Sequence, residues 1–387
     1  MLKNNTILLW AKAFWCLCPI FLVMIFFTQS TSCSRKQIAL HYIDTLSVPH
    51  NIGYVMSCYS PIEDSQVNTY YYVTESGHAV LNYCIGSILP YSKFKHKNFI
   101  SNYFLENDSN LVIQFPRERY LIRINNKSEI KDTLKLRMRN KTGESYVMET
   151  FNEQYYIPIA KDSGILICRA FLKSESDYCQ NINSRIKKFS SPVFHTFVVE
   201  DNQINQTSKG IGKYPYAHLQ KDIARYHYFG HSTMNKDTDI VKIYPFVDSI
   251  FVIHLDGTQE RHFFHSKYQK HENEAFNASV YDFDGINRHL CMQTSYSYII
   301  YDSYRNCYYI AVSKPISPEN TDGTRNLSED RPWSLIVLDN KFNQLGEIDM
   351  PEQFSKHELM IVPDGLAIKD NSLKKGNENI FVICDIY

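Results

Sequence analysis

One pattern recurs along this chain of 387 residues: a short apolar or aromatic run, a turn rich in Asp, Asn and Gly, and a second apolar run. Asp, Asn and Gly tolerate the backbone conformations that reverse a strand, so each copy predicts a β-hairpin. The clearest copies span residues 70–84, 121–136, 197–212, 250–264 and 335–350. Successive hairpins form antiparallel sheets, and we therefore predict an all-β protein.

The spacing of these hairpins suits a β-propeller. Their turns begin near Glu75, Asn125, Asp201, Asp256 and Asp339, at intervals of roughly 50 to 85 residues. Dividing the mature chain by a blade of roughly 50 to 60 residues gives six or seven blades, and we predict a six-bladed β-propeller. Seven blades or stacked β-sandwiches are the alternatives, although the Cys…Trp…Cys spacing and the linkers expected of sandwiches are missing.

The two ends of the chain complement each other. Residues 43–49 (IDTLSVP) look like the outer strand of a blade, without inner strands before it. The missing partners stand at the other end, in residues 359–368 and 380–387. We predict that the N-terminal strand joins the C-terminal blade, which leaves no terminal sheet with a long unpaired edge. Residues 34–387 then form a single β-propeller domain.

Residues 1–33 have the order of an export signal. Lys3 and Lys12 precede an apolar run from Ala13 to Phe27, and small polar residues separate that run from Cys33. A helix of this length spans about 20 to 25 Å, short of a hydrocarbon core of roughly 30 Å. A signal peptide is therefore favoured over a permanent membrane span.

Cys33 stands where a bacterial lipoprotein carries its acylated cysteine. Thr31 and Ser32 are small enough for cleavage there, whereas Ser30 replaces the aliphatic residue that a lipobox usually has at that position. An ordinary signal peptide or a chance cysteine is the alternative. We predict lipid attachment at Cys33, the membrane as a partner through the acyl anchor, and a location in the cell envelope, at the outer membrane and facing the periplasm.

Charge and cysteine content narrow the possible partners. Lys+Arg and Asp+Glu both number 41, so no overall positive field attracts nucleic acid. The seven cysteines beyond Cys33 have the spacing of neither a disulfide framework nor a zinc site. Most are expected to be buried apolar residues, although Cys168 with Cys179, or Cys291 with Cys307, could bridge neighbouring strands.

The C-terminal third resembles a known family. The resemblance rests on residues 298–310 (YIIYDSYRNCYYI), 333–351 (WSLIVLDNKFNQLGEIDMP), 363–368 (PDGLAI) and the final IFVICDIY. These segments resemble domain-of-unknown-function family 4221, whose members look like six-bladed, TolB-like propeller lipoproteins of Gram-negative envelopes. Relatives often have Tyr-Tyr-Arg where this chain has Tyr308, Tyr309 and Ile310. The resemblance implies a fold and a location, and it assigns no catalytic residue.

Several groups of residues have partial metal-site spacing. The histidines are His227 and His231, and then His254, His262 and His265. The acidic groups are Asn235, Asp237 and Asp239, and then Asp282, Asp284 and Gly285. No HExxH accompanies the histidines, and Ile240 and Phe246 stand where a calcium loop needs Gly and Glu. We therefore predict hydrogen-bonded histidines, two polar turns, no metal and no cofactor.

Catalytic motifs are incomplete. Ser184 and Lys187 form an SxxK without its companion elements, and no GxSxG or phosphate-binding motif is present. Residues 256–258 and 322–324 (both DGT) echo a sialidase box without its tryptophan. The catalytic residues therefore stay unknown.

Two functions fit these observations. The leading hypothesis is an envelope module that binds a glycan, a peptide or another envelope protein and is not an enzyme, with Tyr214, Tyr216, Tyr226 and Tyr228 as candidate contact residues. Each tyrosine has packing between blades as its alternative role. The competing hypothesis is a polysaccharide-directed hydrolase or lyase with its site at the propeller channel, where carboxylates, histidines or a metal would converge. A third reading is a structural or signalling partner of a transporter.

Overall fold

A computed structural model divides the chain into two compact units, Met1–Gln37 and Ile38–Tyr387. The structure describes residues 38–49, 52–60, 65–73, 79–85, 92–96, 102–107, 110–114, 120–125, 129–137, 146–148, 154–160, 163–172, 189–200, 203–215, 230–269, 283–375 and 378–386. All of these belong to the second unit. Cys33 therefore lies outside the described residues.

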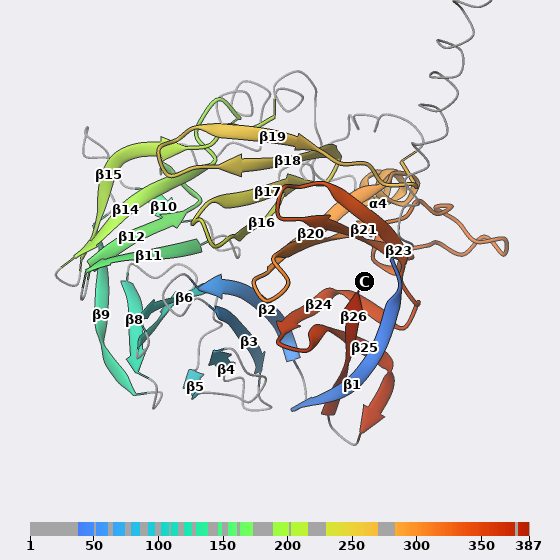
Figure 1. Ribbon diagram of the computed structural model, residues 1–387, viewed down its shortest axis with the longest axis horizontal. Coiled ribbons are helices and arrows are strands. Elements are labelled where there is room, and N and C mark those ends of the chain that lie inside the picture. The colour runs from blue at the N-terminus through green and yellow to red at the C-terminus, as the bar shows by residue number, and fades with distance from the viewer. Residues whose placement is uncertain are drawn as a thin grey trace, which may run out of the picture. The chain divides into compact units, whose positions relative to one another are not determined.

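Sheets of mostly antiparallel strands make up the second unit (Figure 1). One sheet contains β2 (Ile52–Ser60), β3 (Ser65–Val73), β4 (Ala79–Ile85) and β5 (Ser92–His96). An eight-stranded sheet contains β6 (Asn102–Asn107), β7 (Asn110–Gln114), β8 (Tyr120–Asn125), β9 (Ile130–Arg137), β11 (Gln154–Ala160), β12 (Ser163–Cys168), β14 (Phe194–Glu200) and β15 (Gln203–Ile211). The short strands β10 (Tyr146–Met148) and β13 (Ala170–Leu172) pair separately.

Three four-stranded sheets follow. They are β16 (His231–Met234), β17 (Ile240–Tyr244), β18 (Val247–Ile253) and β19 (Gln259–Phe263); β20 (Ser295–Asp302), β21 (Cys307–Ser313), β22 (Trp333–Asp339) and β23 (Gln344–Asp349); and β24 (Phe354–Val362), β25 (Gly365–Lys375), β26 (Glu378–Ile386) and β1 (Leu40–Pro49). The helix α4 (Phe283–Met292) precedes β20, and the 3-10 turn η3 (Ser328–Asp330) precedes β22. All five predicted hairpins are present.

The all-β propeller prediction is confirmed, but the number of blades is not. The described residues form five sheets of four or more strands instead of six. The difference arises because β15 pairs in parallel with β9, from Gln203 opposite Lys135 to Asn205 opposite Arg137. This pairing merges two antiparallel runs into one sheet, and the spacing of hairpins along a sequence carries no signal for such a contact.

Closure by the two ends of the unit is confirmed. Strand β1 pairs antiparallel with β26, with Tyr42 opposite Cys384 and Val48 opposite Asn379 (Figure 1). The chain segment before β1 reaches the neighbouring sheet as well, because a Cβ at Gly346 of β23 would lie 2.7 Å from Ile38 Cδ1. The N-terminal strand therefore completes one sheet and contacts the next.

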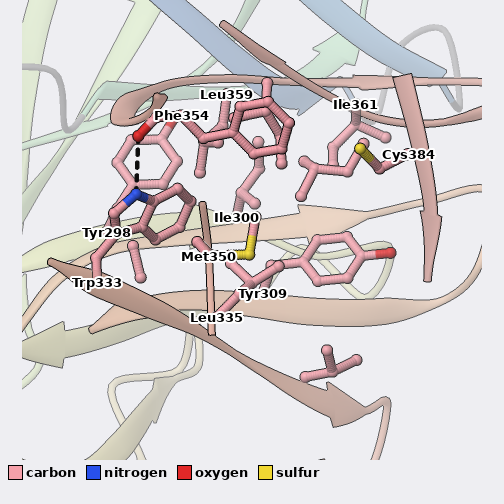
Figure 2. Packing of buried hydrophobic residues seen from close by; sticks show 14 of the residues in the cluster. Tyr298, Ile300, Tyr309, Trp333, Leu335, Met350, Phe354, Leu359, Ile361 and Cys384 are labelled. Carbon is pink, nitrogen blue, oxygen red and sulfur yellow. Dashed lines mark hydrogen bonds between the residues drawn. The ribbon is translucent and has the colours of Figure 1, made fainter. Parts of the chain in front are cut away.

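A continuous core lies between the last two sheets. Strand β21 and residues 333–338 of β22 are buried at every position, as expected for strands covered on both faces. Figure 2 shows Trp333 among Phe354, Leu359 and Met350, with its indole Nε1–H donating to the main-chain oxygen of Phe354 at 2.8 Å. This hydrogen bond satisfies the one polar atom of an otherwise apolar side chain.

An ion pair fastens the same two sheets at the turn between β20 and β21. The buried Asp302 carboxylate accepts the main-chain N–H groups of Tyr304 and Arg305, the Arg305 guanidinium at 2.9 Å and the Tyr309 hydroxyl at 3.2 Å. Arg305 also donates to the main-chain oxygens of Val362 and Pro363, in the turn after β24. One arginine thus joins the turns of two adjacent sheets.

A short segment after β19 covers the outer strand of the next sheet. The main-chain N–H groups of His265 and Lys267 donate to Gln344 and Glu347 of β23. Asp349, at the end of β23, pairs with Lys267 at 2.9 Å and Lys314 at 2.6 Å. Burial alone would raise the pKa of Asp349, but these lysines and a hydrogen bond from the Tyr268 hydroxyl hold it well below its usual range.

One local prediction, the second polar turn, is wrong. Asp284 and Gly285 stand in the first turn of α4 and not in a turn before a strand, while Asp282 lies outside the described residues. An aspartate near a helix N-terminus is stabilised by the helix dipole, and Asp284 also pairs with Arg325.

In the described part of the chain, no helix combines the length and apolar character needed to cross a bilayer.

Of the two disulfides that the spacing left open, Cys291 and Cys307 form none, and Cys179 of the other pair lies outside the described residues. Cys168, Cys291, Cys307 and Cys384 are buried, which confirms for these four the prediction of buried apolar cysteines. Cys291 lies near the start of β20, whereas Cys307 follows the turn at the other end of that strand. Eight strand residues span about 25 Å, too far for an S–S bond.

Candidate functional site

Hairpin turns at one end of the β16–β19 and β20–β23 sheets share one geometry. In residues 235–239, 254–258 and 339–343, the first N–H donates to the oxygen of the fifth residue. The fourth residue has positive φ, at 62° in Thr238, 89° in Gly257 and 64° in Phe342. Residues 235–239 thus form a polar turn, as predicted, and not a calcium loop.

Both DGT segments are such turns too. Asp256 accepts the N–H and the hydroxyl of Thr258, and Asp322 accepts the same groups of Thr324. Aspartate and threonine satisfy each other locally in this arrangement, which is a structural use of both residues. The likeness of these segments to a sialidase box is therefore a likeness of turn chemistry.

The candidate histidines separate into three environments. His254 Nδ1 lies 2.7 Å from Asp239, and Glu260 stands between His254 at 3.6 Å and His262 at 3.2 Å. His265 pairs with Asp248. His231 accepts the Ile299 N–H at 3.3 Å and its ring lies 4.0 Å from that of Tyr298.

This placement matches the prediction of hydrogen-bonded histidines for His231, His254, His262 and His265; His227 lies outside the described residues. Within the described ranges, no group of three or more His, Cys, Asp or Glu residues has a geometry that could hold a metal ion. The hydrogen bond to Asp239 raises the pKa of His254, although burial acts in the opposite direction. This histidine cluster, His254 with Asp239, Glu260 and His262, therefore links the turn at residues 235–239 to the turn at residues 254–258 by charge.

A pocket of about 520 Å³ lies beside this cluster, between the end of β15 and the turn after β18. Its size falls in the range of small-ligand sites. Its lining residues come from three segments, and they are Phe189, Ser190, Ser191, Pro192, Gly210, Gly212, Lys213, Tyr214 and Gly257.

Glycines let the three segments approach closely. A Cβ at Gly210 would lie 2.2 Å from Pro192 Cγ, and a Cβ at Gly212 would lie 2.7 Å from Ile253 Cδ1. Gly212 also has a φ of 73°, which side-chain-bearing residues rarely adopt. Its carbonyl accepts the Val193 N–H at 3.2 Å. Main chain therefore forms much of the pocket wall.

Aromatic rings form another part of the wall. Phe189 and Tyr214 meet edge to face with ring centroids 5.1 Å apart, and Tyr214 lies 6.1 Å from Tyr244 behind it. Tyr214 is only 8% exposed, so it packs between sheets and lines the pocket at the same time. Tyr216, Tyr226 and Tyr228 lie outside the described residues, as do Ser184 and Lys187.

The lining of the pocket is mostly uncharged. Among its described lining residues, Lys213 is the only basic side chain and no carboxylate, histidine or cysteine is present. The remaining lining offers hydroxyl groups, main-chain groups and aromatic surface, which bind neutral polar ligands through hydrogen bonds and ring contacts.

Residues 189–192 were missed by reasoning from the sequence. They follow no recognised motif, and they join the site only because Val193 pairs with Gly212 in the folded chain. The one available signal was the segment KGIGKY at residues 209–214, since two glycines at a strand end indicate a close main-chain approach.

Two buried cations lie elsewhere, near α4. Arg331 donates to the main-chain oxygens of Leu290 and Gln293 at the C-terminal end of the helix, and to Ser295. Lys356 donates to the main-chain oxygen of Glu329 at 2.9 Å. Burial, and then the neighbouring Arg331, lower the pKa of Lys356 to about 8. Both side chains hold the helix and loop in place.

Comparisons with known proteins agree on the fold. The family model described as Domain of unknown function (DUF4221) matches residues 97–349. A solved structure of a DUF4221 member from Bacteroides vulgatus has a TM-score of 0.62 and 14% identity, covering 91% of this chain and 99% of its own. At this identity the similarity shows a shared fold.

Other solved structures are less similar. A luciferin-regenerating enzyme has a TM-score of 0.41 and 10% identity, covering 90% of this chain and 95% of its own. Virginiamycin B lyase from Staphylococcus aureus has a TM-score of 0.37 and 8% identity, covering 90% of this chain and 99% of its own. None of the curated proteins matches this chain.

Proposed function

This chain belongs to the DUF4221 family, and from that premise we propose that it is a lipoprotein of the cell envelope whose β-propeller is a binding module. The ligand class we propose is a glycan, a peptide or a segment of another envelope protein. Nucleic acid is not an expected partner, because the chain has no net charge.

The pocket is the observation that carries this proposal. Its volume of about 520 Å³ accommodates a few sugar rings or a short peptide segment, and its wall combines aromatic rings, serine hydroxyls and main chain. Packing against Phe189 and Tyr244 holds Tyr214 in place before a ligand arrives. Such preorganisation reduces the entropy lost on binding.

The location follows from the N-terminal sequence. Export by the signal peptide and acylation at Cys33 would place the propeller on the periplasmic face of the outer membrane. Labelling with radioactive palmitate tests this part: the label should be present in the wild type and lost in Cys33→Ala. Undiminished labelling of the variant would refute acylation at Cys33.

A binding assay with a blocked pocket tests the module. The detergent-solubilised mature protein is applied to glycan and peptide arrays, and the hits are measured again with Ser190→Trp, which fills the pocket, and Ser190→Ala, which keeps it open. We expect the tryptophan variant to lose at least tenfold in affinity, and the alanine variant, which removes one hydroxyl but blocks nothing, to lose clearly less. Equal binding by both variants would contradict this site.

The same reagents address the competing function. A polysaccharide hydrolase or lyase would release shorter chains from a glycan that binds, whereas a binding module leaves the glycan intact. Product analysis by mass spectrometry separates these results. Turnover that survives Ser190→Trp would place an active site elsewhere in the propeller.

A further inference from the structure

The tether between the proposed anchor and the folded unit is short. Cys33 and Ile38, where the described structure begins, are five positions apart. At no more than about 3.5 Å per residue, the tether reaches at most about 17 Å. A folded unit of about 350 residues has a radius of gyration near 20 Å. A unit of that size cannot turn freely on such a tether, so the surface around Ile38 must face the bilayer.

The surface around Ile38 carries exposed apolar side chains. Tyr42 and Ile43 on β1 are 60% and 51% exposed, and Leu345 on β23 is 46% exposed. Leu345 is adjacent to Gly346, which contacts Ile38. These three side chains therefore lie close to the point where the tether enters the fold.

The position of β1 makes this exposure unusual. β1 is the outermost strand of its sheet, and its pairing with β26 shifts register between Tyr42 and Asp44, so that Ile43 has no opposite residue. Charges and bulges on an edge strand hinder pairing with other chains, and β1 has both, in Asp44 and in this bulge. The exposed apolar groups beside them therefore suit a covering surface that needs no main-chain pairing, such as a bilayer.

The tether also carries charge suited to a membrane. Arg35 and Lys36 lie between Cys33 and Ile38, with no acidic residue among them. Basic residues next to an anchor are attracted to an anionic lipid surface. Tyrosine side chains favour the headgroup region, where the ring and the hydroxyl both find suitable surroundings.

We propose that Tyr42, Ile43 and Leu345 form a membrane-contacting edge, which the short tether from acylated Cys33 holds in the headgroup region of the bilayer. This inference rests on the proposed lipid anchor. The edge sets which side of the propeller faces the membrane and leaves the other sides open to ligands.

Depth-dependent quenching tests the proposal. The lipidated mature chain is reconstituted in phosphatidylethanolamine and phosphatidylglycerol vesicles that contain brominated lipid, and tryptophan fluorescence is measured for Ile43→Trp. The matched control is Ile130→Trp, at an isoleucine of similar exposure (57%) on β9 of the eight-stranded sheet. The native Trp333 is buried and contributes a constant background. We expect at least twofold stronger quenching at position 43 than at position 130.

The possible outcomes distinguish failure of the lipid anchor from failure of the membrane-contacting edge. Vesicle binding with equal quenching at both positions would overturn the edge and leave the anchor intact. Failure to bind vesicles would overturn both. Shielding of position 43 that rises with protein concentration and persists without brominated lipid would show that a second copy covers the edge, and would also overturn the proposal.

A longer tether tests the geometric argument separately. Inserting about twelve Gly and Ser residues after Lys36 adds up to about 40 Å of reach. We expect quenching at position 43 to fall to the level at position 130, because the enlarged tether lets the unit turn. Unchanged quenching would refute the claim that tether length orients the propeller.

Discussion

Replacing Arg305 with alanine should weaken the contact between the last two sheets. Arg305 is the partner of the buried Asp302 carboxylate, at 2.9 Å, and its guanidinium also donates to two main-chain oxygens in the turn after β24. The variant removes these bonds and leaves Asp302 buried without its counter-ion. The Asp302 carboxylate keeps the N–H of Tyr304, the N–H of residue 305 and the hydroxyl of Tyr309.

The size of the effect follows from these remaining contacts. Breaking a buried ion pair costs roughly 3 to 5 kcal/mol, and the three surviving hydrogen bonds place the cost near the lower end, about 3 kcal/mol. With an unfolding entropy of about 2.1 cal/mol/K per residue, a unit of about 350 residues gives roughly 0.7 kcal/mol/K. A loss of about 3 kcal/mol therefore lowers Tm by about 4 °C.

Thermal unfolding followed by circular dichroism measures this shift. Arg305→Lys is the matched control, because it keeps the charge but loses the planar fork, and its Tm should fall between those of the wild type and Arg305→Ala. The double variant with Asp302→Ala should be less destabilised than the sum of the two single variants, since the pair acts as a unit. A Tm for Arg305→Ala within about 1 °C of the wild type would refute the assigned role.

Three further variants probe other contacts. Trp333→Phe removes the hydrogen bond to the Phe354 carbonyl, and the free energy of unfolding in urea should fall by roughly 1 to 3 kcal/mol; no loss would mean that water replaces the indole. Gly212→Ala should cost at least about 1 kcal/mol more than Gly323→Ala, because both positions have positive φ but only the first would clash with a neighbouring side chain. Since the folded state raises the pKa of His254, its ion pair stabilises the fold fully below the ordinary histidine pKa of about 6.5 and stops doing so as pH rises through the raised value. The stability difference between wild type and His254→Gln should therefore be larger near pH 5 than near pH 9, and a difference that grows with pH would reverse this conclusion.

Local chemistry explains why the hairpins and the closing strand were predictable. A turn such as residues 254–258 is satisfied by its own Asp and Thr side chains, so its conformation is specified within five residues. The unpartnered outer strand at residues 43–49 was recognisable because its apolar pattern needs a sheet to join. Residues 359–368 and 380–387 read as inner strands that lacked an outer strand, and the second of these segments corresponds to β26, with which β1 pairs.

Contacts between distant segments explain what was missed. The parallel pairing of β15 with β9 involves polar residues such as Gln203 and Lys135, which give no apolar signal, and it changed the number of blades. Helix α4 is ten residues long, too short for its pattern to stand out among strands. The pocket needs residues 189–192 to meet Gly257 of another sheet, a juxtaposition that exists only in the folded chain.

The segments recognisable in the sequence of the C-terminal third and the residues that line the pocket form separate sets, although the family model reaches both. Asp302, Arg305 and Trp333 belong to the recognisable segments, and each fastens one sheet to the next. None of them lines the pocket, whose side chains come from a loop before β14 and the end of β15. A loop can change its side chains without disturbing contacts between sheets, since a rigid scaffold positions it. Relatives that share the fastening residues should therefore share this architecture, while the ligand of the pocket is free to differ from one member to another.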